Sequence, residues 1–291
     1  MTGNLRSLVV HLRLHFQLLL APVFLWGWLI AGGGLTPAML LGFVSFHGFL
    51  YSGATAFNSY YDRDEGPVGG LEHPPRVVPA LLPFSLGIQV TGWIMAFFVN
   101  LPFWLAYGGF LALSAAYSHP WLRLKAHTLA SLAVVGLGQG ALAFLAAWAA
   151  ARGEIGSVWD LDGALGILSS VLLILGLYPL TQLYQRDEDA TRGDRTVVVA
   201  WGSGPSFIFA MTCTLAGGTL MLALLARRFG ALDALLVGLG LALQVVSLAR
   251  WARRFDVREV LANYRRVMRL NVLSATMLGG YLIVRLALSW C

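Results

Sequence analysis

The sequence predicts an all-α, polytopic membrane protein with nine transmembrane helices, arranged as two four-helix halves plus one extra helix. Of its 291 residues, 58% are hydrophobic and only 12% are charged, which is typical of membrane proteins and unlike soluble domains. Nine apolar runs approach the roughly 20 residues that a helix needs to cross a bilayer core. These runs are uniformly apolar rather than alternating, which favours helices over the strands of a barrel.

The expected spans follow one another along the whole chain, so we expect residues 1–291 to form a single membrane-embedded domain. They are placed near residues 17–32, 36–57, 83–99, 102–118, 128–150, 163–184, 205–226, 231–249 and 270–289. A cleaved signal peptide is the alternative for the N-terminal arm (residues 1–17), but the charged part is too long and no clear cleavage site follows. An acidic loop follows the second and sixth spans, and a basic loop follows the fourth and eighth, which indicates an internal duplication.

The distribution of basic residues predicts the orientation of the spans. With the N-terminus inside, the loops 58–82, 119–127, 185–204 and 250–269 share one side, and with the N-terminal arm they hold 16 of the 20 Lys and Arg residues. This bias places them in the cytoplasm, so we expect a multi-pass protein of a bacterial inner membrane. The run 250–269 predicts an interfacial helix against anionic lipid headgroups. Nucleic acid is not an expected partner, because the arginines lie between hydrophobic runs.

The first acidic loop, residues 58–82, carries candidate metal ligands. Asn58 and Asp62 are four residues apart and therefore share one helix face, and Asp64 lies just before Gly66 and Pro67 end the helix. Oxygen donors of this kind suit Mg²⁺, which is often shared with substrate phosphates. A solvated helix end with cationic neighbours is the competing interpretation.

The second acidic loop, residues 185–204, repeats this pattern with Asp187, Asp189 and Asp194. Two carboxylate clusters on one side of the membrane are suited to hold Mg²⁺ ions around a diphosphate, so that the metal neutralises the leaving group. Arg192 and Arg195 are expected to bind the remaining phosphate charge, because a guanidinium matches phosphate geometry.

The loop after the fourth span supplies further donors. Tyr117, Arg123 and Lys125 offer a hydroxyl and two cations on the same side of the membrane, as an anion clamp would. Anchoring of the helix by Arg and Lys at the cytoplasmic side explains the two cations equally well. The expected cavity liners are aromatic residues next to the acidic loops, whose π faces stabilise a carbocation; they are Tyr51, Tyr60, Tyr61 and Tyr184.

These features together resemble the UbiA superfamily of intramembrane prenyltransferases over almost the whole chain. That family has nine helices, aspartate-rich loops after the second and sixth, and a Tyr-Ser-x-Pro-x-x-Leu-Lys type loop after the fourth. The resemblance implies that Asn58 and Asp62 form the first motif and that Arg76 is the arginine of the stretch after it. It further implies that the second motif includes Asp189, Gly193 and Thr196. The diphosphate contacts of the central loop would be Tyr117, Arg123 and Lys125.

The chain departs from the family pattern at three acidic positions. Ser59 and Gly66 stand at two acids of the first motif, and Gln185 replaces the leading Asp of the second. Acids next to these positions are candidates to supply the missing ligands, namely Asp64, Glu65, Asp187 and Glu188. These substitutions leave the reaction open between transfer to an acceptor and another outcome at the same site.

The expected activity is Mg²⁺-dependent transfer of a prenyl group from an isoprenyl diphosphate to an aromatic or other lipophilic acceptor, through an allylic cation. A terpene cyclase of the same superfamily is the first alternative, and a transporter, suggested by the duplication, is the second. A lipid phosphotransferase is disfavoured because its signature is absent. The expected metal ligands are Asn58, Asp62, Asp64, Asp187, Asp189 and Asp194; the catalytic residues are Asp62, Asp189, Tyr117 and Lys125; the substrate contacts are Arg63, Arg76, Arg123, Lys125, Arg192, Arg195, Tyr61 and Tyr184.

Overall fold

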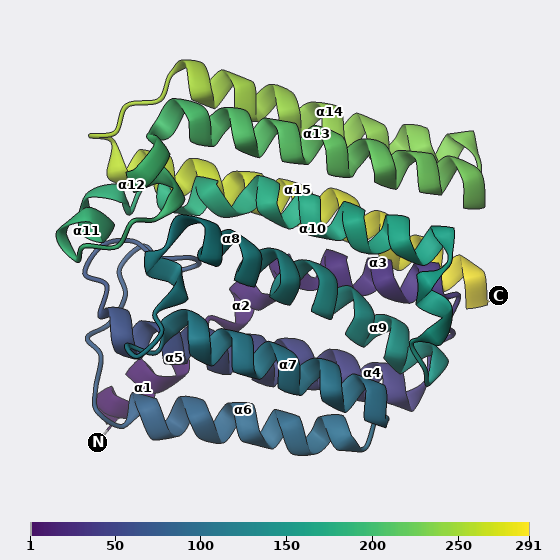
Figure 1. The fold of residues 1–291 in the computed structure, drawn as a ribbon, viewed down its shortest axis with the longest axis horizontal. Coiled ribbons are helices and arrows are strands. Elements are labelled where there is room, and N and C mark those ends of the chain that lie inside the picture. Colours follow the sequence, from purple (N-terminus) through teal and green to yellow (C-terminus); the bar gives the residue numbers. More distant parts are fainter. Residues whose placement is uncertain (1, 291) are drawn as a thin grey trace.

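The computed structural model describes residues 2–290, and every named element in this range is a helix. Long helices run side by side, with short helices and loops gathered at one end (Figure 1). The elements are α1 Thr2–His11, α2 Leu14–Gln17, η1 Leu18–Leu20, α3 Ala21–Ala31, α4 Pro37–Phe43, η2 Val44–Tyr51, α5 Ser52–Asp62, α6 Leu81–Phe97, α7 Leu101–Ser118, η3 Leu124–Ala126, α8 Thr128–Val135, η4 Gly136–Leu142, α9 Ala143–Arg152, η5 Gly156–Trp159, α10 Leu161–Gln182, α11 Arg186–Thr191, α12 Val197–Trp201, α13 Ser203–Arg228, α14 Ala231–Arg253 and α15 Val260–Trp290.

The all-helical prediction is confirmed, and helices occupy all nine expected segments. Within residues 2–290, seven helical stretches are long and apolar enough to cross a membrane. The two remaining segments are α6, which is apolar but shorter, and α7. The exact number of nine membrane crossings therefore stays a prediction.

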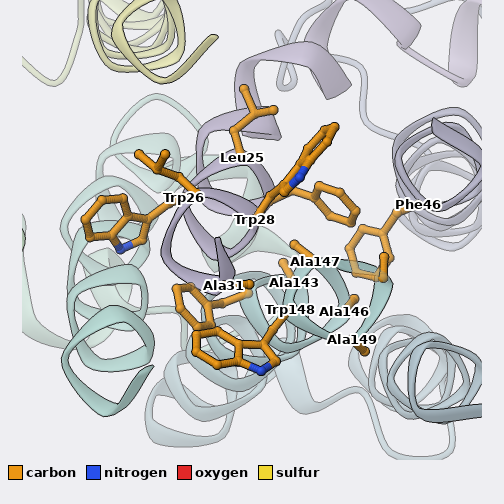
Figure 2. Packing of buried hydrophobic residues seen from close by; sticks show 14 of the residues in the cluster. Leu25, Trp26, Trp28, Ala31, Phe46, Ala143, Ala146, Ala147, Trp148 and Ala149 are labelled. Carbon is orange, nitrogen blue, oxygen red and sulfur yellow. The ribbon is translucent and has the colours of Figure 1, made fainter. Parts of the chain in front are cut away.

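The largest buried core lies where α3 packs against α9. Helix α9 is rich in alanine, and its small side chains let the two helices approach closely, while the indole of Trp26 points away from these alanines (Figure 2) and donates a hydrogen bond to Ser169 of α10. Gly27 makes the closest approach, because a Cβ there would lie 2.5 Å from the carbonyl oxygen of Phe144. Small residues at helix interfaces are the usual way to bring helices together within a bilayer.

Two π-helical segments, η2 and η4, interrupt otherwise regular helices. Such segments are rare and occur mainly at functional sites. Tyr51 at the end of η2, and Gly138 and Gln139 in η4, line the same central cavity. The irregular backbone is therefore concentrated around the space that a ligand would fill.

The prediction of a separate interfacial helix at 250–269 is wrong. Helix α14 extends to Arg253 and α15 begins at Val260, so most of this basic run belongs to the ends of two long helices. The short link between them is fixed by Asn263, which accepts a hydrogen bond from Trp251 Nε1 at 3.1 Å and donates one to the carbonyl of Asp256 at 2.7 Å. The buried amide, with its partners satisfied, stabilises the tight connection that lets both helices continue.

Candidate active site

The acidic loops after α5 and α10 meet at one end of the bundle, beside the loop after α7 (Figure 1). Arg192 connects the two acidic loops, since its Nη1 lies 2.7 Å from Oδ1 of Asp64. The backbone NH of Arg195 donates to the carbonyl of Ala126 at 2.9 Å, which joins the second acidic loop to the central one. Three segments that are far apart in sequence therefore form one polar surface.

Helix α5 presents the first carboxylates at its C-terminus. The helix ends at Asp62 because Arg63 adopts a left-handed backbone conformation, with φ 51° and ψ 42°. The side chains of Asp62 and Asp64 are 7% and 4% exposed, respectively. Carboxylates this buried need charged partners, and both have them.

Two cations of the central loop neutralise acids from both loops. Lys125, itself buried, forms an ion pair with Asp62. Arg123 binds both carboxylate oxygens of Asp194, at 2.9 and 2.8 Å, and lies 3.6 Å from Asp62. The hydrogen bond to Asp194 raises the pKa of Arg123 further above its usual value. Asp62 and Asp194 therefore share one guanidinium group.

Arg192 is the central cation of the second loop. It donates to Asp64 at 2.7 Å and to Asp189 at 2.8 Å, and it lies 3.4 Å from Glu188 and 3.8 Å from Asp194. Burial raises the pKa of Asp189 to about 6, although the hydrogen bond from Arg192 acts in the opposite direction. Burial therefore moves the pKa of Asp189 toward neutral pH.

The donor chemistry of this surface fits Mg²⁺, although the carboxylates are paired with cations rather than preorganised around a metal. Across residues 2–290, no three His, Cys, Asp or Glu side chains are close enough together to hold a metal ion. The oxygens of Asp62, Asp64, Asp189 and Asp194 nevertheless converge from two loops, and hard oxygen donors are those that Mg²⁺ prefers.

A cavity of about 260 Å³ lies next to this surface, and its wall is formed by residues of the adjoining helix ends and of the neighbouring helices. Its wall includes Asn58, whose amide donates to Ser118 Oγ at 3.3 Å, and Tyr117, whose hydroxyl lies 2.9 Å from that of Tyr178. Tyr184 also lines it, and its buried hydroxyl has no hydrogen-bond partner. The cavity thus combines aromatic faces with a few polar groups, as ligand pockets commonly do.

A second, more apolar cavity of about 400 Å³ lies between α3, α10, α13, α14 and α15. Its wall shares Leu19, Leu20, Ile174, Leu177 and Ser274 with the first cavity. The two spaces are therefore neighbours across a thin layer of side chains. Together they extend from the polar surface into the apolar interior.

Several predicted site residues lie at the margin of this surface. The side chains of Arg63, Arg76, Asp187 and Arg195 are exposed, and none of them forms an ion pair in the described part of the chain. Tyr61 stacks edge-on with His119 at 5.2 Å and does not line either cavity. Their assignment to metal or substrate stays a prediction.

Sequence reasoning missed Arg13 and Tyr178, both of which line the cavity. Tyr178 lies within the uniformly apolar run of α10, where one aromatic residue gives no signal. From the sequence alone, Arg13 contributes only to the positive bias that orients the chain. Its position among leucines, without neighbouring acids, was the available signal of an internal cation.

A sequence model described as the UbiA prenyltransferase family matches residues 19–273. The chain belongs to this family. A comparison with curated proteins finds no significant match. The predicted resemblance to the UbiA family is thereby confirmed, and with its apolar helices the chain is a multi-pass membrane protein.

Solved structures of UbiA homologues share the fold at low sequence identity. A UbiA homolog from Archaeoglobus fulgidus bound to GPP and Mg²⁺ is 16% identical with a TM-score of 0.71, over 97% of this chain and 99% of that one. A UbiA homolog from Aeropyrum pernix K1 is 20% identical with a TM-score of 0.70, over 93% and 97% of the two chains. A digeranylgeranylglyceryl phosphate synthase is 15% identical with a TM-score of 0.65, over 99% and 100%.

Proposed function

We propose that this protein is a Mg²⁺-dependent prenyltransferase that moves the prenyl group of an isoprenyl diphosphate to an aromatic or other lipophilic acceptor. Its UbiA-family membership supports prenyl transfer, and the Archaeoglobus fulgidus homologue was observed with GPP or DMAPP together with Mg²⁺. The proposal places the whole chain in one domain, with the N-terminus and the polar surface in the cytoplasm. The excess of Lys and Arg in the loops on that side supports this orientation.

The observation that carries the proposal is the set of ion pairs at the same helix ends that contribute aromatic residues to the cavity. Lys125, Arg123 and Arg192 each pair with a carboxylate, so anion-binding and cation-binding groups alternate on the polar surface, next to the helix ends that line the cavity. A diphosphate and its metal bring complementary charges to this surface. The cations can then transfer from carboxylate to phosphate oxygens, while the carboxylates become available as metal ligands.

In this mechanism, the chain binds the diphosphate and protects the cation formed from the prenyl group. Asp62, Asp64, Asp189 and Asp194 would hold Mg²⁺, which would supply neutralisation of the charge on the departing diphosphate. The ammonium and guanidinium groups donate to the developing negative charge on its oxygens. The faces of Tyr51 and Tyr117 line the cavity below, where they stabilise an allylic cation and exclude water.

The test is turnover by the purified protein in detergent. Isoprenyl diphosphates of ten to twenty carbons are incubated with aromatic and lipid acceptors, with and without Mg²⁺, and pyrophosphate release and products are measured. Asp62→Ala and Asp189→Ala should each abolish turnover while the folded protein remains intact, whereas Glu259→Ala, a more exposed carboxylate paired only with Arg266, should retain it. Full Mg²⁺-dependent activity in both aspartate variants would falsify the proposal.

A terpene cyclase is the second candidate, because Ser59, Gly66 and Gln185 replace acids of the usual family motifs. The same incubations separate the two activities. A cyclase releases pyrophosphate and forms a hydrocarbon or alcohol product without any acceptor. The transferase requires the acceptor and forms a product that contains it.

A further inference from the structure

Arg13 is a buried cation whose charge has no acidic partner. It joins α1 to α2 and is only 5% exposed, with a left-handed backbone at φ 49° and ψ 42°. This conformation is unfavourable for a residue other than glycine and persists only where the surroundings fix it. The local fold therefore holds the guanidinium at a defined position.

The contacts of the Arg13 side chain are few and neutral. Nη1 donates to the carbonyl of Gly69 at 3.2 Å, and Nη2 donates to Ser59 Oγ at 2.5 Å. The buried Nε has no hydrogen-bond partner. Among the described residues, no carboxylate lies within ion-pair distance of this group; Asp64 and Asp62 act on it only from farther away. A buried charge in this state is costly unless something else pairs with it.

Its position shows where such a partner would lie. Arg13 lines the 260 Å³ cavity together with Asn58, Tyr117 and Tyr184. Lys125, Arg123 and Arg192 are each paired with carboxylates, whereas Arg13 has no carboxylate within ion-pair distance among the described residues and lines the cavity. Arg13 and Tyr184 both line this cavity, and each carries a buried polar atom that has no hydrogen-bond partner.

We propose that Arg13 binds an anionic oxygen of a substrate inside the cavity, which makes it a specificity-determining residue of the site. The inference rests on the proposed function. The anion is either a phosphate oxygen of the isoprenyl diphosphate or an acidic group on the acceptor, and a guanidinium suits both. Its links to Ser59 and Gly69 hold the side chain in place from the opposite side.

The test compares Arg13→Gln and Arg13→Lys with Arg6→Gln, which removes the same charge from an exposed position in the same arm. Affinity for inorganic pyrophosphate and for geranyl diphosphate, each with Mg²⁺, is measured by calorimetry, and KM is measured for acidic and neutral acceptors. A diphosphate contact predicts about 10- to 100-fold weaker pyrophosphate binding in Arg13→Gln. An acceptor contact predicts unchanged pyrophosphate binding and a raised KM for acidic acceptors only.

Two further variants separate anion binding by Arg13 from a purely structural role of its side chain. Ser59→Ala removes one hydrogen-bond partner of Arg13 but keeps the guanidinium, so under our proposal this variant retains most of its anion binding. Arg13→Lys keeps the fold and a positive charge, so its affinity for the anion should be intermediate. If Arg13→Lys and Arg13→Gln bind every ligand as tightly as the unaltered protein does, the inference is wrong. Failure of the unaltered protein to bind geranyl diphosphate with Mg²⁺ would instead reject the proposed function, so the two failures are distinguishable.

Discussion

Replacement of Arg192 by Gln should destabilise the ligand-free protein, and Mg²⁺ should restore much of the lost stability. Arg192 contacts Asp64 and Asp189 within 2.8 Å and lies near Glu188 and Asp194, so its removal leaves several carboxylates close together without their shared cation. Breaking a buried ion pair costs roughly 3–5 kcal/mol. Because the Arg192 side chain is 21% exposed, solvent screening reduces this to an expected loss of about 2 kcal/mol.

The assay is thermal unfolding in detergent over a Mg²⁺ titration. A loss of about 2 kcal/mol corresponds to a melting temperature lower by about 5 °C for a chain of this size. Since a divalent ion compensates for the missing positive charge, Mg²⁺ should raise the melting temperature of Arg192→Gln more than that of the unaltered protein. Arg186→Gln, which removes an exposed charge from α11, is the matched control and should change neither value.

The reasoning is refuted if Arg192→Gln melts like the control in the absence of metal. It is also refuted if Mg²⁺ stabilises the variant and the unaltered protein equally. The first result would mean that the carboxylates do not depend on their cation. The second would mean that the metal does not bind where the guanidinium lies.

Four further outcomes are expected. Because Mg²⁺ needs the ionised carboxylate and burial raises the pKa of Asp189 to about 6, Mg²⁺ affinity measured by calorimetry should fall as the pH is lowered through about 6. Lys125→Met should lower kcat/KM about 100-fold or more in the product assay, because it removes a donor to the diphosphate. Gly140→Ala should cost about 1–3 kcal/mol in thermal unfolding, since its Cβ would lie 2.6 Å from Val171 Cα, whereas Gly87→Ala meets no atom within 4 Å and should be tolerated. Calorimetry should also show that Mg²⁺ and pyrophosphate each bind more tightly when the other is present.

The helices and the meeting of the two acidic loops could be predicted because both follow from simple periodic properties of the chain. Apolar runs predict most helix ends to within a few residues, but α15 begins at Val260, ten residues before the expected span, and the first helical stretch begins at Leu5, before the expected residue 17. The early start of α15 depends on the buried amide of Asn263 and its link to Trp251. That contact joins two helices, and no local sequence pattern predicts it.

The pairing of individual charges could not be predicted, because it depends on the direction of the chain at a few residues. The left-handed backbones of Arg63 and Arg123 turn the loops so that Asp62 and Asp194 come to one guanidinium. Neither position carries the glycine that would have signalled such a turn. Arg13 has the same unusual backbone, which explains why a residue that appeared to orient the chain lies inside the cavity instead.

Charge balance explains why the ligand-free site is held by ion pairs. Four carboxylates, Asp62, Asp64, Asp189 and Asp194, lie beside the three cations Lys125, Arg123 and Arg192, so each carboxylate has a cationic partner and most of the negative charge at the edge of the apolar bundle is compensated. Diphosphate arriving alone would meet the carboxylates, and Mg²⁺ arriving alone would have to displace the cations. Each ligand therefore removes the unfavourable charge left by the other, and by linkage the two must assist one another equally in binding. The departure of the diphosphate with its metal lets the ion pairs re-form, which offsets part of the cost of releasing product.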